Sequence, residues 1–119
     1  MGTLDTLTSK DLNVKQVDFT DTDTNPKTVW SPPSGRIKLN NVMLAAHNKS
    51  ANSTMTFKLE ALRKGSWVEL AVCGAENKSY GNMVIDFHGL LRCNELRIRK
   101  VGSSSSWDAW AMVTGSVEE

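Results

Sequence analysis

The segment Thr28-Val29-Trp30-Ser31-Pro32-Pro33-Ser34-Gly35-Arg36-Ile37-Lys38-Leu39 decides the fold of this chain. A short apolar run ends in two prolines and a glycine, which are residues that favour turns. Apolar and charged residues then alternate, which is the pattern of a half-buried β-strand. The segment therefore marks the point at which a polar leader ends and a β-structured body begins.

The leader, residues 1–27, predicts an extended N-terminal arm. Residues 1–26 carry five aspartates and two lysines, a net charge of −3, whereas the whole chain carries +1. The stretch 20–26 is rich in Thr and Asp and cannot form a core by itself. One strand is expected near residues 14–20, where the apolar residues of the leader cluster: Val14, Val17 and Phe19.

The remainder, residues 28–119, predicts a single all-β domain. At 119 residues in total the chain has no room for a second core. About seven or eight short strands are separated by turns, which is the spacing of an antiparallel sandwich or a barrel. Besides the strand that begins at Arg36, strands are expected at 54–61, 67–72, 83–87, 96–101 and 107–117.

Two local patterns refine this prediction. The alternation of residues 36–39 resumes with shifted phase at Val42, so a β-bulge is expected at Asn40 and Asn41. Residues 54–61 alternate most clearly, and the turn at Lys64-Gly65 predicts that they form a hairpin with 67–72.

The tryptophans are the most informative side chains, because four of them occur in this short chain. Trp107 and Trp110 lie three residues apart in the last expected strand, so they point to opposite faces of the sheet. One is expected in the core and the other on the surface. A surface tryptophan is a frequent anchor of protein interfaces and also serves as a stacking platform for sugars.

No residue pattern indicates catalysis. A Gly-x-Ser-x-Gly nucleophile turn and a Gly-rich phosphate loop are both missing from the sequence. Asp86-Phe87-His88 follows an apolar strand and is interpreted as a turn, and nothing singles out Asp86 and Glu69 as a carboxylate pair. The sequence therefore predicts that the protein is not an enzyme and has neither catalytic nor cofactor-binding residues.

The cysteines and histidines predict no metal site. His47 and His88 lie in unrelated contexts without the spacing of metal ligands. Cys73 and Cys93 are interpreted as two buried free thiols, with a disulfide between adjacent strands as the alternative.

The charge pattern disfavours two classes of partner. Arg97, Arg99 and Lys100, with Trp107 nearby, resemble a face that grips single-stranded nucleic acid, but a net charge of +1 provides no strong positive field. No apolar run approaches the roughly 18 residues that a membrane span needs. The N-terminus lacks the pattern of a signal peptide, so synthesis and retention in a cytoplasm are expected.

Within the segment quoted first, residues 30–39 resemble a sequence pattern of small structural proteins of tailed bacteriophages. Residues 84–90, 94–98 and 112–115 are similar to the same layout, so the resemblance spans roughly 28–117. It implies a jelly-roll-like antiparallel β-sandwich, preceded here by the extended arm. It also implies a structural role, either on a capsid shell or on a tail or fibre.

The function expected from this resemblance is that of a non-enzymatic virion protein. A capsid decoration or cement protein would bind the major capsid protein or another virion protein, as a homo-oligomer with the trimer favoured, and would be assembled in the host cytoplasm. The alternative is a carbohydrate-binding module or a tail or fibre receptor-binding sandwich. The side chains expected to anchor interfaces are Phe19, Trp30 and Trp110.

Overall fold

The computed structural model describes residues 12–50, 53–76, 78–102 and 106–119. They form strands and connecting turns, and no helix occurs among them. Residues 1–11 of the expected arm lie outside the described residues. The strands are β1 (Asn13–Thr20), β2 (Lys27–Trp30), β3 (Arg36–Asn48), β4 (Thr54–Arg63), β5 (Ser66–Glu76), β6 (Tyr80–Cys93), β7 (Glu95–Gly102) and β8 (Trp107–Glu118).

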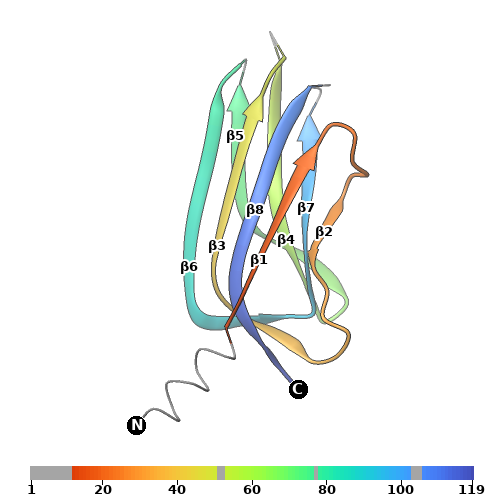
Figure 1. Cartoon of the computed structure of the whole chain (residues 1–119), viewed down its shortest axis with the longest axis vertical. Helices are drawn as coiled ribbons and strands as arrows, with labels where there is room; N and C mark the ends of the chain where they lie inside the picture. The colour runs from red at the N-terminus through yellow and green to blue at the C-terminus, as the bar shows by residue number, and fades with distance from the viewer. Residues whose placement is uncertain (1–11, 51–52, 77, 103–105) are drawn as a thin grey trace.

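The strands form two four-stranded sheets that face each other (Figure 1). One sheet has the order β1-β8-β3-β6, and the other has the order β2-β7-β4-β5. All pairings are antiparallel. This strand order, with crossings between the sheets at nearly every connection, is that of a jelly roll. The predicted all-β jelly-roll sandwich is therefore confirmed.

The core lies between the sheets and is supplied by alternate residues of each strand. Met55, Phe57, Leu59 and Ala61 of β4 are all buried, as their alternation predicts. Phe57 also belongs to an aromatic cluster, in which the ring centroid of Phe19 lies 6.3 Å from that of Phe57 and 4.6 Å from that of Trp107. The cluster joins the two sheets near one end of the sandwich.

Strand β1 is an integral edge of the first sheet. It pairs with β8 from Asn13 opposite Gly115 to Thr20 opposite Asp108, so the strand expected near 14–20 is confirmed. The side chain of Phe19 is fully buried. Residues 13–20 thus belong to the sandwich of the same chain, while the independent folding of residues 28–119 stays a prediction.

The expected β-bulge is present in β3. Its pairings with β6 and with β8 both shift register between Leu39 and Asn41. On β6 the pairing jumps from Asp86 to Leu91, so residues 87–90 form an excursion. His88 and Gly89 have positive φ angles of 54° and 71°, and the His88 N–H donates to Asp86 Oδ1 at 2.8 Å. Asp86-Phe87-His88, interpreted from the sequence as a turn that follows a strand, instead lies within β6, which continues to Cys93.

Strand β6 differs from the prediction. An apolar strand was expected at 83–87, but the strand runs from Tyr80 to Cys93 and forms an edge of its sheet. Among the described residues no strand pairs with that edge, and Val84, which shares the outer face with Met43, is 66% exposed. Ile85 and Phe87 still pack against the core, so the apolar composition of this segment reflects burial only in part.

The two sheets approach each other closely where β5 meets β6. A Cβ atom on Gly81 would overlap the carbonyl oxygen of Gly74. A glycine at position 81 is therefore required by backbone contact between the sheets rather than by an unusual φ angle.

Candidate functional site

The outer face of the β1-β8-β3-β6 sheet carries a row of apolar side chains. Cross-strand register places Trp110 of β8 opposite Ala45 of β3, and the next row on the same face places Met112 opposite Met43. Met43 in turn lies opposite Val84 of β6. Residues that pair across strands share one face of a sheet. The sheet thus presents apolar surface to the exterior as well as to the core.

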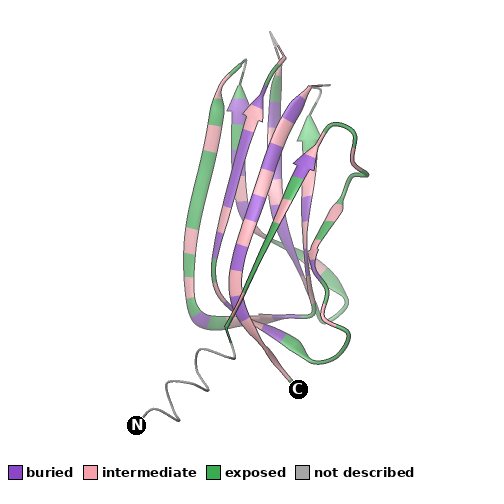
Figure 2. Ribbon diagram, viewed as in Figure 1, coloured by how far each residue is buried: buried purple, intermediate pink, exposed green. Residues whose placement is uncertain are grey.

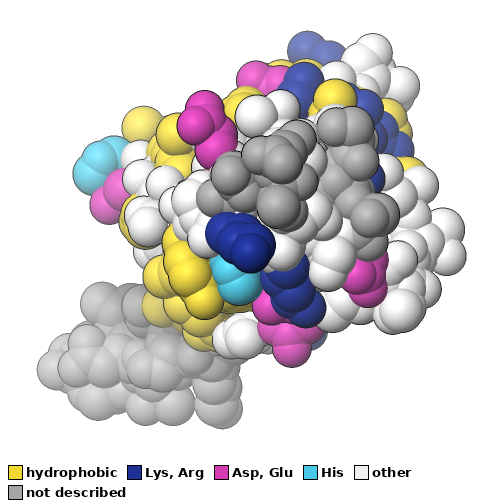
Figure 3. Space-filling model, turned by 90° about the horizontal axis from the view of Figure 1, so that it is seen from above, with side chains coloured by type: hydrophobic (Ala, Val, Ile, Leu, Met, Phe, Trp, Pro, Cys, Tyr) yellow, Lys and Arg dark blue, Asp and Glu magenta, His cyan; other side chains and the backbone are white. Residues whose placement is uncertain are grey.

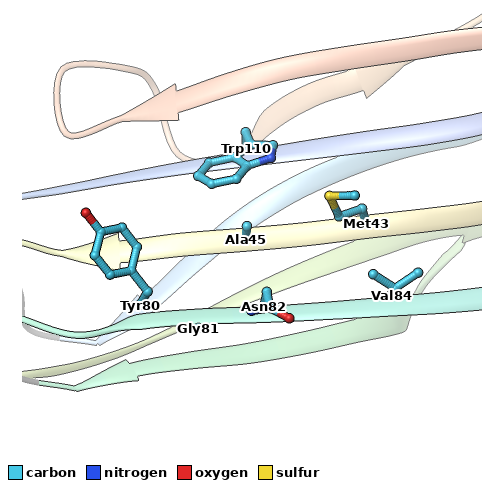
Figure 4. Close-up of a pocket in the computed structure, with 7 residues that line it drawn as sticks. All are labelled: Met43, Ala45, Tyr80, Gly81, Asn82, Val84 and Trp110. Carbon is cyan, nitrogen blue, oxygen red and sulfur yellow. The ribbon is translucent and has the colours of Figure 1, made fainter.

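This face contains a hollow of about 330 Å³, which we call the Trp110 hollow. Figure 4 shows Trp110 of β8 on one side of it and side chains of β6 on the other, with Ala45 between them. The small side chain of Ala45 lies between larger side chains of the neighbouring strands, and this difference in size contributes to the concavity. The lining residues are Met43, Ala45, Tyr80, Gly81, Asn82, Val84 and Trp110.

A short polar cluster borders the hollow at one end. The ring of His47 stacks on that of Tyr80, with 4.0 Å between centroids and an interplanar angle of 7°. Asp108 Oδ1 lies 2.9 Å from Lys49 Nζ, and this hydrogen bond raises the pKa of Lys49. Seen from this end, hydrophobic side chains gather on one flank beside a histidine and a cation (Figure 3). The hollow is therefore apolar inside and charged at one end.

Trp110 is the expected anchor that the structure places on the surface. It is half-buried and lines the hollow, whereas Trp107 is only 4% exposed in the core. The prediction that these two rings point to opposite faces is confirmed. Phe19 and Trp30 are 0% and 7% exposed, so their own chain already covers both rings.

Of the seven residues that line the hollow, only Trp110 was expected from the sequence to form a contact surface. Val84 lies in the strand expected at 83–87, and no sequence pattern singled out Met43 or Tyr80. The alternation of residues along β3 indicates that Met43 faces away from the core. Placing Met43 beside Trp110 also requires the register between β3 and β8. That register depends on the β3–β8 pairing, which no local pattern reveals.

The outer face of the other sheet is occupied by a charged network. Glu60 of β4 is 6% exposed, and its Oε1 and Oε2 lie 2.8 Å from Arg97 Nε and 3.1 Å from Arg99 Nη2. Burial by itself would raise the pKa of Glu60, but hydrogen bonds from Arg99 and Arg97 outweigh it and the pKa is lowered. The guanidinium of Arg97 also lies 3.8 Å from the ring centroid of Trp67. Both arginines are thus paired.

A smaller concavity of about 160 Å³ lies near the ends of β4 and β6. Arg36, Arg63, Lys64 and Arg92 contribute to its lining. Arg92 Nε is 2.9 Å from Glu118 Oε1, and hydrogen bonding to Arg92 lowers the pKa of Glu118. Part of the positive charge is therefore balanced by the last strand.

The two cysteines are free and buried, as predicted. Burial raises the pKa of each thiol to about 11, so both are largely protonated near neutral pH. Among the residues that the structure describes, no three His, Cys, Asp or Glu side chains are grouped as metal ligands would be. Within the same residues, no helix is long and apolar enough to cross a membrane.

Comparison with known proteins identifies no family. No protein-family model matches the chain, and no curated protein sequence matches it.

Solved structures nevertheless share its architecture. The chain resembles Eiger TNF from S. frugiperda with 8% identity and a TM-score of 0.53, over 92% of this chain and 94% of that one. It resembles the PBSX exported protein XepA with 13% identity and a TM-score of 0.52, over 91% of this chain and 38% of that one.

A phage capsid structure is also among the similar folds. The cyanophage Pam1 capsid asymmetric unit has 16% identity and a TM-score of 0.48, over 90% of this chain and 85% of that one. At these identities the comparisons show the fold alone, a jelly-roll β-sandwich.

Proposed function

We propose that this chain is a virion structural protein that attaches to other protein subunits through the Trp110 hollow. The observation that carries the proposal is an apolar concavity on the outer face of a sheet whose inner face already supplies a complete core. Jelly-roll sandwiches are common building blocks of viral shells. The phage-like pattern of residues 30–39 supports the same role.

The chemistry of the hollow favours a protein partner. Its walls are Trp110, Met43 and Val84, and polar atoms come chiefly from Asn82 and from the Tyr80 hydroxyl. An apolar hollow with an aromatic wall and a charged border is typical of the centre of a protein interface. The partner side chain that fits it is a large aliphatic or aromatic one.

More specifically, we propose that the chain is a capsid decoration or cement protein. The partner would be the major capsid protein, and the protein would act without catalysing a reaction. Self-association is part of this proposal, because weak contacts repeated over linked copies add up to tight attachment. The trimer is the oligomer that the resemblance to phage proteins implies.

A sugar ligand is the second candidate function. Trp110 and Tyr80 offer two rings, and Asn82 offers an amide that could bind hydroxyl groups. A glycan array tests this candidate directly. Binding of a glycan that is lost in Trp110→Ala would favour it over a protein partner.

The test of the proposed function is co-sedimentation with shells assembled from the major capsid protein of the same virus. Trp110→Ala should weaken binding at least about 30-fold, as expected for a central aromatic anchor. Trp67→Ala is the matched control, because Trp67 is a half-buried tryptophan on the outer face of the other sheet.

Circular dichroism and thermal unfolding establish that both variants fold. Shell binding that is equal in Trp110→Ala and Trp67→Ala would contradict the proposal, as would a folded wild-type protein that does not bind shells.

A further inference from the structure

Strand β6 is an edge strand with unusually apolar exposed side chains. It pairs with β3 on one side, and no described strand pairs with its other side (Figure 1). Figure 2 shows exposed residues along most of its length. Tyr80, Met83 and Val84 are 71%, 36% and 66% exposed. An open edge presents unpaired backbone N–H and C=O groups to any incoming strand.

The other sheet edges carry features that discourage such pairing. β1 has the charged residues Lys15 and Asp18, and β2 spans only Lys27–Trp30. β5 carries a bulge, since Leu59 pairs with Ala71 and Glu60 with Glu69. Charges, shortness and bulges are the usual protections of an edge strand.

β6 lacks these protections between Tyr80 and Ile85. This part of the strand contains neither a charged residue nor a proline, and its pairing with β3 is regular as far as Asp86. The excursion begins at Phe87, beyond this segment. This part of β6 is thus an open edge without the usual protections.

We propose that two copies of this chain pair antiparallel through β6, about a two-fold axis at Met83. A two-fold contact uses the same surface on both copies, and an antiparallel strand pair has this symmetry. Two four-stranded sheets would join into one continuous sheet across the contact. The inference rests on the self-association in the proposed function and not on shell binding.

The side chains of β6 suit this register. With Met83 at the axis, Asn82 lies opposite Val84 and Tyr80 lies opposite Asp86 of the second copy. These four residues share the outer face, because they pair with outward positions of β3. The Tyr80 hydroxyl can donate a hydrogen bond to the Asp86 carboxylate. No like charges face each other, so a second copy is an occupant that the segment accepts without electrostatic penalty.

The mass of the protein in solution is the first test. The β6 contact alone gives two copies, and together with a three-fold contact elsewhere it gives six. Light scattering after size exclusion or analytical ultracentrifugation should therefore report an even number of chains. A mass of one or three chains would overturn the β6 contact.

Val84→Lys tests which surface is used. A lysine at the centre of the edge should raise the dissociation constant of the pair at least about tenfold, since each contact contains the position twice. Val14→Lys is the matched control, because Val14 is 63% exposed on β1, the opposite edge of the same sheet. Equal association of the two variants would assign self-association to another surface.

A disulfide at the axis tests the register. In Met83→Cys the two new thiols face each other across the axis, and mild oxidation should link most of the protein as a covalent pair. Cys73 and Cys93 do not compete, because both are buried and protonated. Val14→Cys is the control, which should remain unlinked. Failure of Met83→Cys to link under conditions where the wild type is paired would overturn the register.

The outcomes separate the two proposals. Loss of pairing in Val84→Lys is measured on the purified protein without shells. Loss of shell binding is measured with Trp110→Ala, a substitution on β8, and β3 lies between β8 and the paired edge of β6. Each proposal can therefore fail while the other holds.

Discussion

At the scale of single residues, Glu60 shows how this molecule tolerates a charge in a nearly buried position. Its carboxylate oxygens accept hydrogen bonds from Arg97 and Arg99, and the side chain is only 8% exposed. The strand alternation predicts outward positions for Arg97 and Arg99, and the structure places them there. Their shared carboxylate was not predictable, because the β4–β7 register joins residues 37 and 39 positions apart.

Replacing Glu60 with Gln should make stability less dependent on pH. The native pKa of Glu60 is below its ordinary value of 4.5, so the carboxylate stabilises the fold above the unfolded-state pKa. That stabilisation is lost as the pH falls through the lowered native pKa. At pH 7 the loss in Glu60→Gln should be about 1–3 kcal/mol, and the difference from wild type should shrink toward pH 3.

Urea unfolding followed by tryptophan fluorescence at pH 7, 5 and 3 measures this difference. Glu69→Gln is the control, because Glu69 is 47% exposed in its pair with Lys58. A surface pair of this kind contributes about 0–1 kcal/mol. A Glu60→Gln difference that is constant across this pH range would contradict the assignment.

At the scale of strands and turns, periodicity predicted what is local and missed what depends on neighbours. The bulge at Asn40–Asn41 and the alternation of buried and outward residues in β4 both follow from patterns in consecutive residues, so both were predictable. A strand was expected at 83–87, which is part of β6, because Met83, Val84 and Ile85 are apolar. Its place at a sheet edge is set by strand order, which the local sequence does not contain.

The contact between β5 and β6 gives a sharp prediction at this scale. Gly81→Ala should destabilise the fold by about 1–3 kcal/mol, because the added methyl group overlaps the Gly74 carbonyl oxygen and forces the backbones apart. Gly74→Ala is the matched control, since its Cβ would meet Met55 O at an ordinary 3.8 Å. Chemical unfolding compares the two, and equal stabilities would show that the sheets do not touch at this point.

At the scale of the whole molecule, the start of the jelly-roll sandwich does not coincide with the change in amino-acid composition along the chain. The composition changes at residue 28, and this predicts an arm before a body. The structure pairs β1 with β8 and places Phe19 against Phe57 and Trp107. A polar segment can thus supply one strand and one aromatic ring of the core. A single phenylalanine within polar sequence only weakly indicates that its segment belongs to the core.

Removal of residues 1–27 tests the division. The shortened chain loses β1 and Phe19, so its free energy of unfolding should fall by more than the roughly 3–5 kcal/mol expected for Phe19→Ala. Thermal unfolding of the full chain, Phe19→Ala and the shortened chain measures the difference. A shortened chain as stable as the full one would establish that residues 28–119 fold alone.

The pairing of the first described strand with the last has a consequence for synthesis. β1 is made before the other described strands, and its partner β8 is made after them. β3 also waits for β8, which lies between it and β1. The sheet that carries Trp110 and β6 therefore cannot close before β8 has been made, and long-range pairing of this kind is slow and exposed to aggregation. We expect this sheet to recruit partners only after β8 has been made.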